Sequence, residues 1–274
     1  MHAQRQDFDH FVLTRFNATV DYGGALGLDP VWLSNRFDLF NRFCYPSVRA
    51  QSNQNFKWIV FFDEHTPEAF KYRVREYATW PNFMPVYVDG LLTDEVSRGI
   101  VAGHVSKEAK YLITTRLDND DAISKNLIKT VQANFNGQEY QFVNFAHGYC
   151  WYNGQVYALE DLSNPFISLI EKIHTTTREF DTVYCGSHTG LSETGQVLQI
   201  ETRPAWIQVI HRGNISNVVR GKKQLIEKLG DDFPINTATS TRQETLSYWL
   251  DQGAFSLRLV RKAFTKMNRM LSRG

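Results

Sequence analysis

The sequence has few cysteines, no long hydrophobic run and almost no excess of charge of either sign. Its three cysteines, Cys44, Cys150 and Cys185, are widely spaced and form no CxxC pair, which argues against a disulfide framework and a thiolate zinc site. No apolar stretch approaches the roughly 18 residues that a membrane-spanning helix needs. The polar N-terminus does not resemble a secretion signal, so we expect a cytoplasmic protein.

The balance of charge excludes one broad class of partner. Thirty basic side chains stand against twenty-nine acidic ones, so the composition provides no general attraction to nucleic acid. A linker rich in Pro, Gly or Ser is also missing, and 274 residues with 42% hydrophobic content can bury a sizeable core. We predict one domain over residues 1–250, followed by a distinct C-terminal segment at 251–274.

The sequence does contain a repeated pattern of apolar strand, polar exit and helix. Strands are predicted at 8–16, 56–62, 84–88 and 112–117, and helices at 30–43, from Pro67 onward and at 93–110. This alternation predicts an α/β fold, with a mainly parallel central sheet covered by helices on both faces. Ligands of such sheets bind along the carboxyl ends of the strands.

The most informative feature lies where the fourth predicted strand ends. Residues 112–121 read LITTRLDNDD, so Asp118, Asp120 and Asp121 fall within four residues. Carboxylates this close repel one another unless a cation neutralises them, and hard divalent ions prefer oxygen ligands. The pattern predicts a divalent cation that faces the phosphate oxygens of a substrate.

Several blocks of the sequence resemble one known family. They are WLSNRFDLFNRFCYPSVRAQ, FKWIVFFDEHTP, ITTRLDNDDAI, NPFISLIEK and AWIQVIHRGNISN. These blocks resemble a bacterial rhamnosyltransferase family with the GT-A fold, a Rossmann-like αβα sandwich whose DxD motif follows the fourth strand. The resemblance implies a metal-dependent, inverting glycosyltransferase. It would move a sugar, rhamnose by the family name, from a nucleoside diphosphate donor to a polysaccharide or glycolipid.

The same resemblance implies roles for individual residues. Residues 1–121 would form the nucleotide-binding half and residues 122–250 the acceptor-binding half. Mn²⁺ or Mg²⁺ would be bound by Asp118, Asp120 and His211. A UDP- or dTDP-linked donor would be contacted by Arg15, Asp63, Arg98, Arg116 and Asp118.

Each of these assignments has a plainer alternative. Asp121 is equally explained as a carboxylate at a helix N-terminus, and His211 as a core histidine bonded to a backbone carbonyl. The three arginines, Arg15, Arg98 and Arg116, could instead pair with the clustered carboxylates. Those pairs would be structural but would still lie in the same site.

An inverting transfer also needs a base to take the proton of the acceptor hydroxyl. The candidates in the second half of the chain are Glu171, Asp181 and His188. The sequence does not choose among them, and an ordinary hydrogen-bonding role explains each one as well.

The stretch 142–157, FVNFAHGYCWYNGQVY, is dense in aromatic residues. Aromatic faces that stack on sugar rings would make it a platform for the acceptor. A buried hairpin core would have the same composition. Trp151 distinguishes these two interpretations best.

The C-terminal residues 256–274 contain basic side chains and no acidic ones. At about 100° per residue the apolar side chains fall on one arc and the basic ones on the other. Such a helix is typical of peripheral contact with an anionic membrane, here the inner face. Packing on the catalytic domain and dimerisation are the alternatives.

Two other functions remain open at this point. A phosphatase of the haloacid dehalogenase type also uses a DxD motif, but after its first strand, and carries Thr or Val where this chain has Ala122. A non-catalytic carbohydrate-binding protein with a degenerate GT-A site is the other alternative. The presence of Asp118, Asp120 and His211 argues against such degeneration.

Overall fold

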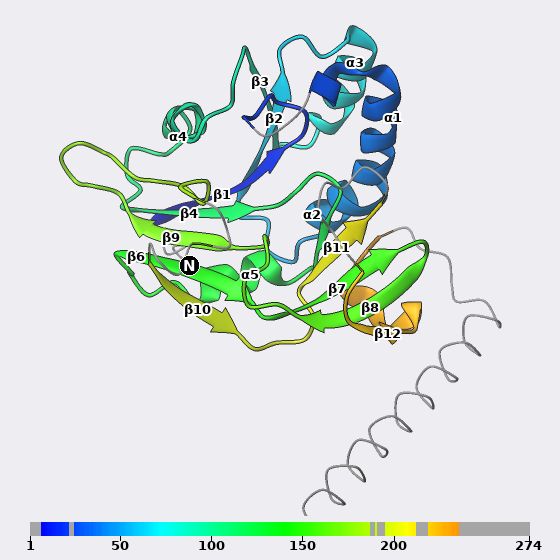
Figure 1. The fold of residues 1–274 in the computed structure, drawn as a ribbon. Coiled ribbons are helices and arrows are strands. Elements are labelled where there is room, and N and C mark those ends of the chain that lie inside the picture. The colour runs from blue at the N-terminus through cyan, green and yellow to red at the C-terminus, as the bar shows by residue number, and fades with distance from the viewer. Residues whose placement is uncertain (1–6, 22–24, 187–189, 191–194, 212–218, 236–274) are drawn as a thin grey trace, which may run out of the picture.

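The computed structural model describes residues 7–21, 25–186, 190, 195–211 and 219–235 (Figure 1). The predicted C-terminal helix at 251–274 and the candidate base His188 lie outside these residues. None of the described helices is long and apolar enough to cross a bilayer.

Seven strands form the larger sheet, in the order β10-β6-β9-β4-β1-β2-β3. Their bounds are Phe8–Arg15 (β1), Lys57–Asp63 (β2), Phe83–Val88 (β3), Tyr111–Arg116 (β4), Tyr140–Phe145 (β6), Ser168–Lys172 (β9) and Gln196–Ile200 (β10). Strands β3, β2, β1 and β4 are mutually parallel. They correspond to the four predicted strands and confirm an α/β architecture.

The prediction of a mainly parallel central sheet is wrong, because the sheet is mixed. Strand β9 lies between β4 and β6 and runs antiparallel to both. A parallel neighbour needs a long crossover connection, usually a helix. Strand β9 instead follows β8 (Gln155–Glu160) through residues 161–167, which contain no helix.

Five α-helices accompany these strands in the described parts of the chain. Their bounds are Pro30–Leu39 (α1), Tyr45–Arg49 (α2), Glu68–Tyr77 (α3), Asp94–Ala102 (α4) and Leu127–Ala133 (α5). A π-helical turn at Phe40–Cys44 joins α1 to α2, so the helix predicted at 30–43 is present and continues. Helix α4 ends at Ala102, eight residues earlier than predicted, because the chain there turns back and Ser106 N donates to Asp9 Oδ2 (2.6 Å).

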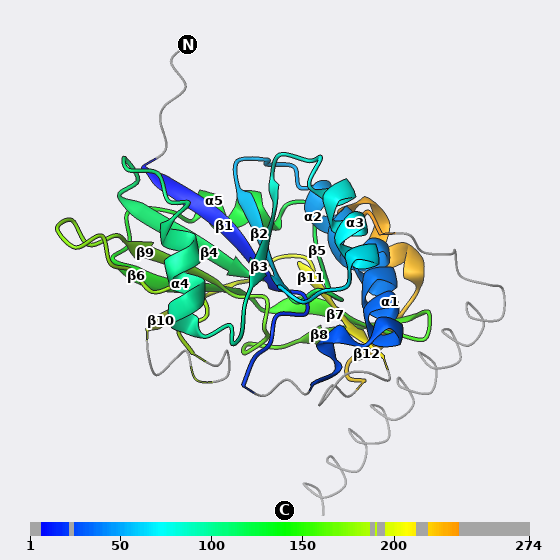
Figure 2. The same cartoon turned by 90° about the horizontal axis from the view of Figure 1, so that it is seen from above.

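The large sheet has two buried faces that carry different helices (Figure 2). Leu33 and Phe37 of α1 pack in one cluster with Val12 of β1, together with side chains of α3 and α5. On the opposite face, Val101 of α4 packs with Leu13 of β1 and with the segment 180–184. We call these the α1 face and the α4 face.

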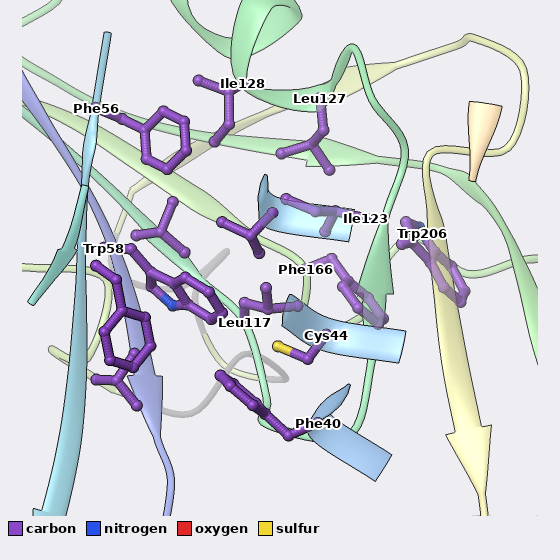
Figure 3. Close-up of a cluster of buried hydrophobic side chains, with 14 of the residues drawn as sticks. Phe40, Cys44, Phe56, Trp58, Leu117, Ile123, Leu127, Ile128, Phe166 and Trp206 are labelled. Carbon is purple, nitrogen blue, oxygen red and sulfur yellow. The ribbon is translucent and has the colours of Figure 1, made fainter. Parts of the chain in front are cut away.

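Figure 3 draws part of the core on the α1 face. It includes Phe40 and Cys44 from the π-helical turn and Leu117 from the loop after β4, all of them fully or almost fully buried. This packing fixes the loop that carries the acidic cluster against the helix that begins at Pro30.

A second sheet of five strands lies beside the first, in the order β12-β8-β7-β11-β5. Its remaining strands are Ala122–Ile123 (β5), His147–Tyr152 (β7), Trp206–Ile210 (β11) and Lys222–Gln224 (β12). Strand β5 directly follows the acidic cluster and pairs with β11. That pairing brings His211, the residue after β11, next to the cluster.

Strands β7 and β8 form the hairpin that the aromatic stretch contributes. Asn153 and Gly154 make its tight turn with positive φ values of 47° and 80°, as a two-residue hairpin turn requires. Trp151 is only 4% exposed, and its ring lies 5.4 Å from that of Phe43. The side chain of Trp151 is therefore part of a hairpin core.

Candidate functional site

The acidic cluster lies at the point where the order of the parallel strands reverses. Strands β2 and β3 lie on one side of β1, while β4 lies on the other. The carboxyl ends of two such strands diverge and leave a crevice, which is the usual ligand position in open α/β sheets. Residues 118–121 come one residue after β4 ends, at this reversal of the strand order.

Asp120 is the centre of the cluster. Its Oδ2 is 2.7 Å from His211 Nε2 and 2.6 Å from Arg36 Nη1. The carboxylate is buried, with 8% of the side chain exposed, and Arg36 is 14% exposed. The loop after β4, the end of β11 and helix α1 therefore meet at one oxygen atom.

The neighbours of Asp120 hold this arrangement in place. Asn119 Nδ2 donates to Phe16 O (2.6 Å), which ties the loop to the end of β1. Asp121 Oδ1 accepts a hydrogen bond from Val209 N (2.7 Å), which ties it to β11. Asp121 thus positions the strand that carries His211, which is a firmer role than that of a helix N-terminal carboxylate.

The two buried carboxyl groups differ in their pKa shifts. Burial alone would raise the pKa of Asp120, but the hydrogen bond from His211 and the charge of Arg36 bring it below its usual value. Burial, followed by the charges of Asp120 and Asp118, raises the pKa of Asp121 well above its usual value. The environment therefore favours one negative charge, on Asp120.

Asp118 faces away from this contact. Its carboxylate pairs with Arg116 (3.3 Å to Oδ2), and 39% of its side chain is exposed. Because side chains alternate along a strand, Arg116 projects to the α4 face, as Thr114 does where it contacts Val183. The cluster thus straddles the edge of the sheet, with Asp118 directed to one side and Asp120 to the other.

Arg15 and Asp63 share the α4 face with Arg116. Arg15 pairs with Asp94 (3.7 Å), and its guanidinium lies 4.0 Å from the centre of the Tyr184 ring. Asp63 accepts from Thr19 Oγ1 (3.0 Å) and His65 N (2.8 Å). Since β2 and β4 flank β1, Asp63 lies about 10 Å across the sheet from the end of β4.

Two of the candidate bases and Arg98 form a separate group. Glu171 Oε2 accepts from Asp181 N (2.7 Å), and Arg98 pairs with Asp181 (3.6 Å). Glu171 is opposite Leu112, at the start of β4 and about 20 Å along the strand from Asp118. The structure does not bring Glu171, Asp181 or Arg98 to the acidic cluster.

Sequence reasoning missed Arg36, the closest cationic partner of Asp120. Its guanidinium also donates to Asn119 Oδ1 (3.2 Å). Its position in the sequence could have identified it. Arg36 lies next to Phe37, on the core-facing side of the predicted helix that follows the first strand. A cation at the border of that apolar side lies near the carboxyl edge of the sheet.

An open hollow adjoins this centre on the α1 face. Its volume is about 390 Å³. It is lined by Trp32, Asn35, Arg36, Asp38, Leu39, Arg42 and His211. The hollow therefore reaches Asp120 only through the two residues that contact it, Arg36 and His211.

The donor atoms at the cluster fit a divalent cation in their chemistry. Carboxylate oxygens and imidazole nitrogen suit Mn²⁺, and oxygens suit Mg²⁺. Asp120 and His211 are already in contact, but Asp118 is turned to Arg116. Among the described residues no three His, Cys, Asp or Glu side chains are yet grouped as a metal site. Binding would require Asp118 to leave Arg116.

One protein family matches most of the chain. Its sequence model, described as "Putative rhamnosyl transferase", matches residues 19–223. The match includes Asp63, Asp118, Asp120 and His211. No curated protein sequence matches the chain.

Solved structures match the chain only at low similarity. S. aureus TarS 1-349 is 11% identical with a TM-score of 0.43, over 73% of this chain and 60% of that chain. The same fragment in complex with UDP-GlcNAc is 11% identical with a TM-score of 0.42, over 76% of this chain and 59% of that chain. A 4-diphosphocytidyl-2C-methyl-D-erythritol synthase from Anaerococcus prevotii is 9% identical with a TM-score of 0.35, over 78% of this chain and 94% of that chain. The chain thus spans about three fifths of the TarS fragment.

Proposed function

The chain belongs to the rhamnosyl transferase family and is a glycosyltransferase, and we propose that it moves a sugar from a UDP- or dTDP-linked donor to a polysaccharide or glycolipid. The sugar that the family description names is rhamnose. The proposed reaction is a single displacement with inversion. The acceptor oxygen attacks the anomeric carbon, the electron pair of the breaking bond leaves with the diphosphate, and the acceptor proton passes to a base.

The convergence at Asp120 supports this proposal most strongly. A buried carboxylate at the carboxyl end of β4 contacts His211 and Arg36, which come from segments far apart in the sequence. Buried charges are costly unless they are paired, so a site that is assembled from three segments indicates a function beyond stability. The β3-β2-β1-β4 order, with the acidic cluster after β4, also supports a fold of the GT-A type.

In this proposal Asp120, His211 and Asp118 hold Mn²⁺ or Mg²⁺. The ion would neutralise the charge that develops on the departing diphosphate. Asp120 is ready for this role because its pKa is lowered, so the carboxylate is ionised at neutral pH. Release of Arg116 from Asp118 would free a guanidinium group to bind phosphate oxygens.

The α4 face would bind the donor. Arg15 and Arg116 project to that face beside the crevice, and Asp63 lies at its border with two hydrogen bonds that fix its carboxylate. A carboxylate has more acceptor positions than these two bonds occupy. Asp63 therefore retains the capacity to accept from the base of a nucleotide.

The base of the transfer stays a prediction. His188 lies outside the described residues. Glu171 and Asp181 lie at the far end of β4. Participation of Asp181 would need the segment 173–185 to move toward the crevice and to leave Arg98 of α4, with which Asp181 pairs. Glu171 is held in β9 between two neighbouring strands.

Thermal shift with UDP, dTDP and their sugar conjugates, each with and without Mn²⁺, tests the proposal. We expect at least one of these nucleotides to stabilise the chain, and to do so more in the presence of Mn²⁺, because a ligand that binds only the folded state raises the melting temperature. A chain that no diphosphate nucleotide stabilises even with Mn²⁺ would contradict the donor and the metal together. It would favour a carbohydrate-binding function.

A further inference from the structure

We propose that the hollow on the α1 face binds a phosphate group carried by the sugar acceptor, and that Arg42 is the residue that selects for this phosphate. The identification of this ligand as the acceptor rests on the proposed function. Binding of a sugar phosphate to the hollow can be measured without any transfer reaction.

The hollow has a basic lining. Its lining includes two guanidinium groups, Arg36 and Arg42, and the imidazole of His211. Asp38 is the carboxylate of the lining, and it is engaged by Arg73 (3.7 Å) from α3. Arg36 is engaged by Asp120. Arg42 therefore contributes an uncompensated positive charge to the hollow.

Arg42 lies against two aromatic rings. Its guanidinium carbon lies 5.0 Å from the centre of the Phe43 ring and 5.4 Å from that of Trp151. No carboxylate pairs with it within the described parts of the chain. Stacking on aromatic faces leaves the edge of a guanidinium open, and that edge binds phosphate with two parallel hydrogen bonds.

The hollow is separate from the expected donor site. Arg15, Asp63 and Arg116 project to the α4 face, whereas the hollow is lined by α1, the π-helical turn and His211. The two sites meet only at the acidic cluster. A group in the hollow would therefore approach the cluster from the side opposite to the donor, as an attacking acceptor must in an inverting displacement.

The apolar part of the lining suits a sugar ring. Trp32 and Leu39 belong to the hollow together with Arg42. An indole face and a polar amide, here Asn35, are typical of a carbohydrate subsite. The combination of this surface with a stacked arginine points to a sugar phosphate ester rather than to a neutral sugar.

The test compares glucose 6-phosphate and glycerol 3-phosphate with methyl glucoside, using the full chain saturated with UDP and Mn²⁺. Calorimetry should give a dissociation constant about tenfold lower, or more, for a phosphorylated compound, because a charged hydrogen-bond pair is worth that much. Arg42→Gln should remove this preference, and Arg42→Lys should keep part of it.

Arg49→Gln is the matched control. Arg49 is also exposed and also stacks on an indole, with its guanidinium carbon 4.8 Å from the centre of the Trp80 ring, but it does not line the hollow. This variant should bind sugar phosphates as the unmodified chain does. Equal losses in both variants, or no preference for phosphate in the unmodified chain, would overturn the proposal.

A separate titration with UDP distinguishes the two possible sources of phosphate. Arg42→Gln should leave the dissociation constant of UDP unchanged. If Arg42→Gln weakened the binding of UDP as much as the binding of glucose 6-phosphate, the hollow would bind the donor diphosphate. The assignment of the hollow to the acceptor would then be wrong. Failure of UDP to bind the unmodified chain would count against the proposed function, while the sugar phosphate titration could still support the hollow.

Discussion

Arg36 supplies the charge that balances Asp120 inside the site. Both side chains are mostly buried and their polar atoms are 2.6 Å apart. Removing one partner of a buried ion pair leaves an uncompensated charge and commonly costs about 3 kcal/mol or more. A cation that binds to Asp120 would replace the missing charge.

Arg36→Ala is therefore expected to depend on metal. In the presence of EDTA, the free energy of unfolding should fall by about 3 kcal/mol. Saturating Mn²⁺ should restore a large part of it, and urea titrations under both conditions measure the difference. Arg75→Ala, which breaks an exposed pair with Glu68, is the control and should change stability little. Equal losses with and without Mn²⁺ would show that no cation replaces Arg36.

Glu171 is a second buried carboxyl group, and it has a different consequence. Burial raises its pKa to about 8, and its Oε1 has no hydrogen-bond partner in the described structure. In the unfolded chain the group ionises at its ordinary pKa, well below 8. Between these two pKa values the unfolded state releases the proton while the folded state keeps it, so stability falls as pH rises.

Glu171→Gln should flatten this dependence. For the unmodified chain, the loss of stability between about pH 5 and pH 8 should approach 1.4 kcal/mol per pH unit. The variant cannot ionise and should become the more stable of the two at pH 8. Melting temperatures across that range, measured in buffers of equal ionic strength, provide the comparison. Parallel profiles for the two proteins would contradict the assigned pKa.

At the scale of elements, β11 carries His211 to the site, and its position depends on Gly148 in β7. A Cβ on Gly148 would overlap the indole of Trp206. That indole stacks on Phe166 with ring centres 4.9 Å apart, and its Nε1 donates to Phe145 O (2.8 Å). The absence of a side chain at Gly148 therefore lets β11 begin where it does.

Gly148→Ala should destabilise the protein by about 1–3 kcal/mol, because overpacking forces the indole out of place. It should also weaken binding of Mn²⁺, since His211 follows the same strand. Gly99→Ala in α4 is the matched control, because a Cβ there meets nothing within 4 Å, and it should be neutral or slightly stabilising. Urea titration measures the free energy of unfolding of both variants. Equal losses of stability in Gly148→Ala and Gly99→Ala would contradict the role of Gly148 in packing.

The sequence predicted those elements whose signal is local. Strands β1 to β4 are apolar runs with a polar exit, and Pro30 marks the start of α1, so these were located correctly. The direction of β9 was not predictable in this way, because its partners in β4 and β6 are distant and no local pattern encodes the sense of pairing. Asp118 and Asp120 were visible as a dense group of carboxylates. Arg36 was not, because its partner lies 84 residues away.

At the scale of the whole molecule, the C-terminal residues 251–274 lie outside the described structure, and their basic amphipathic pattern stays a prediction. If they bind an anionic surface, the full chain should sediment with vesicles that contain phosphatidylserine, and a chain that ends at residue 250 should not. High salt should release the full chain, because surface charges are screened. Equal sedimentation of the two chains would contradict membrane contact through this segment.

At the scale of the whole molecule, we propose that the two faces of the large sheet bind different substrates, the donor on one face and the acceptor on the other. The α4 face, proposed to bind the donor, carries Arg15, Asp63 and Arg116. The α1 face carries the hollow, and Asp120 lies between the two. Loss of Asp120 should therefore abolish transfer without unfolding either face. Its isosteric amide cannot replace the charge that a cation needs.

Release of nucleoside diphosphate tests this account most directly. The full chain is incubated with Mn²⁺, with UDP- and dTDP-linked sugars, dTDP-rhamnose among them, and with a mixture of glycan and glycolipid acceptors that can take the sugar. Free UDP or dTDP is measured beside Asp120→Asn. We predict release from at least one donor by the unmodified chain, and release at least about a hundredfold slower by the variant, in line with the loss of a dominant electrostatic contact. Release from no donor, or equal release by both proteins, would contradict a nucleotide-sugar transfer centred on Asp120.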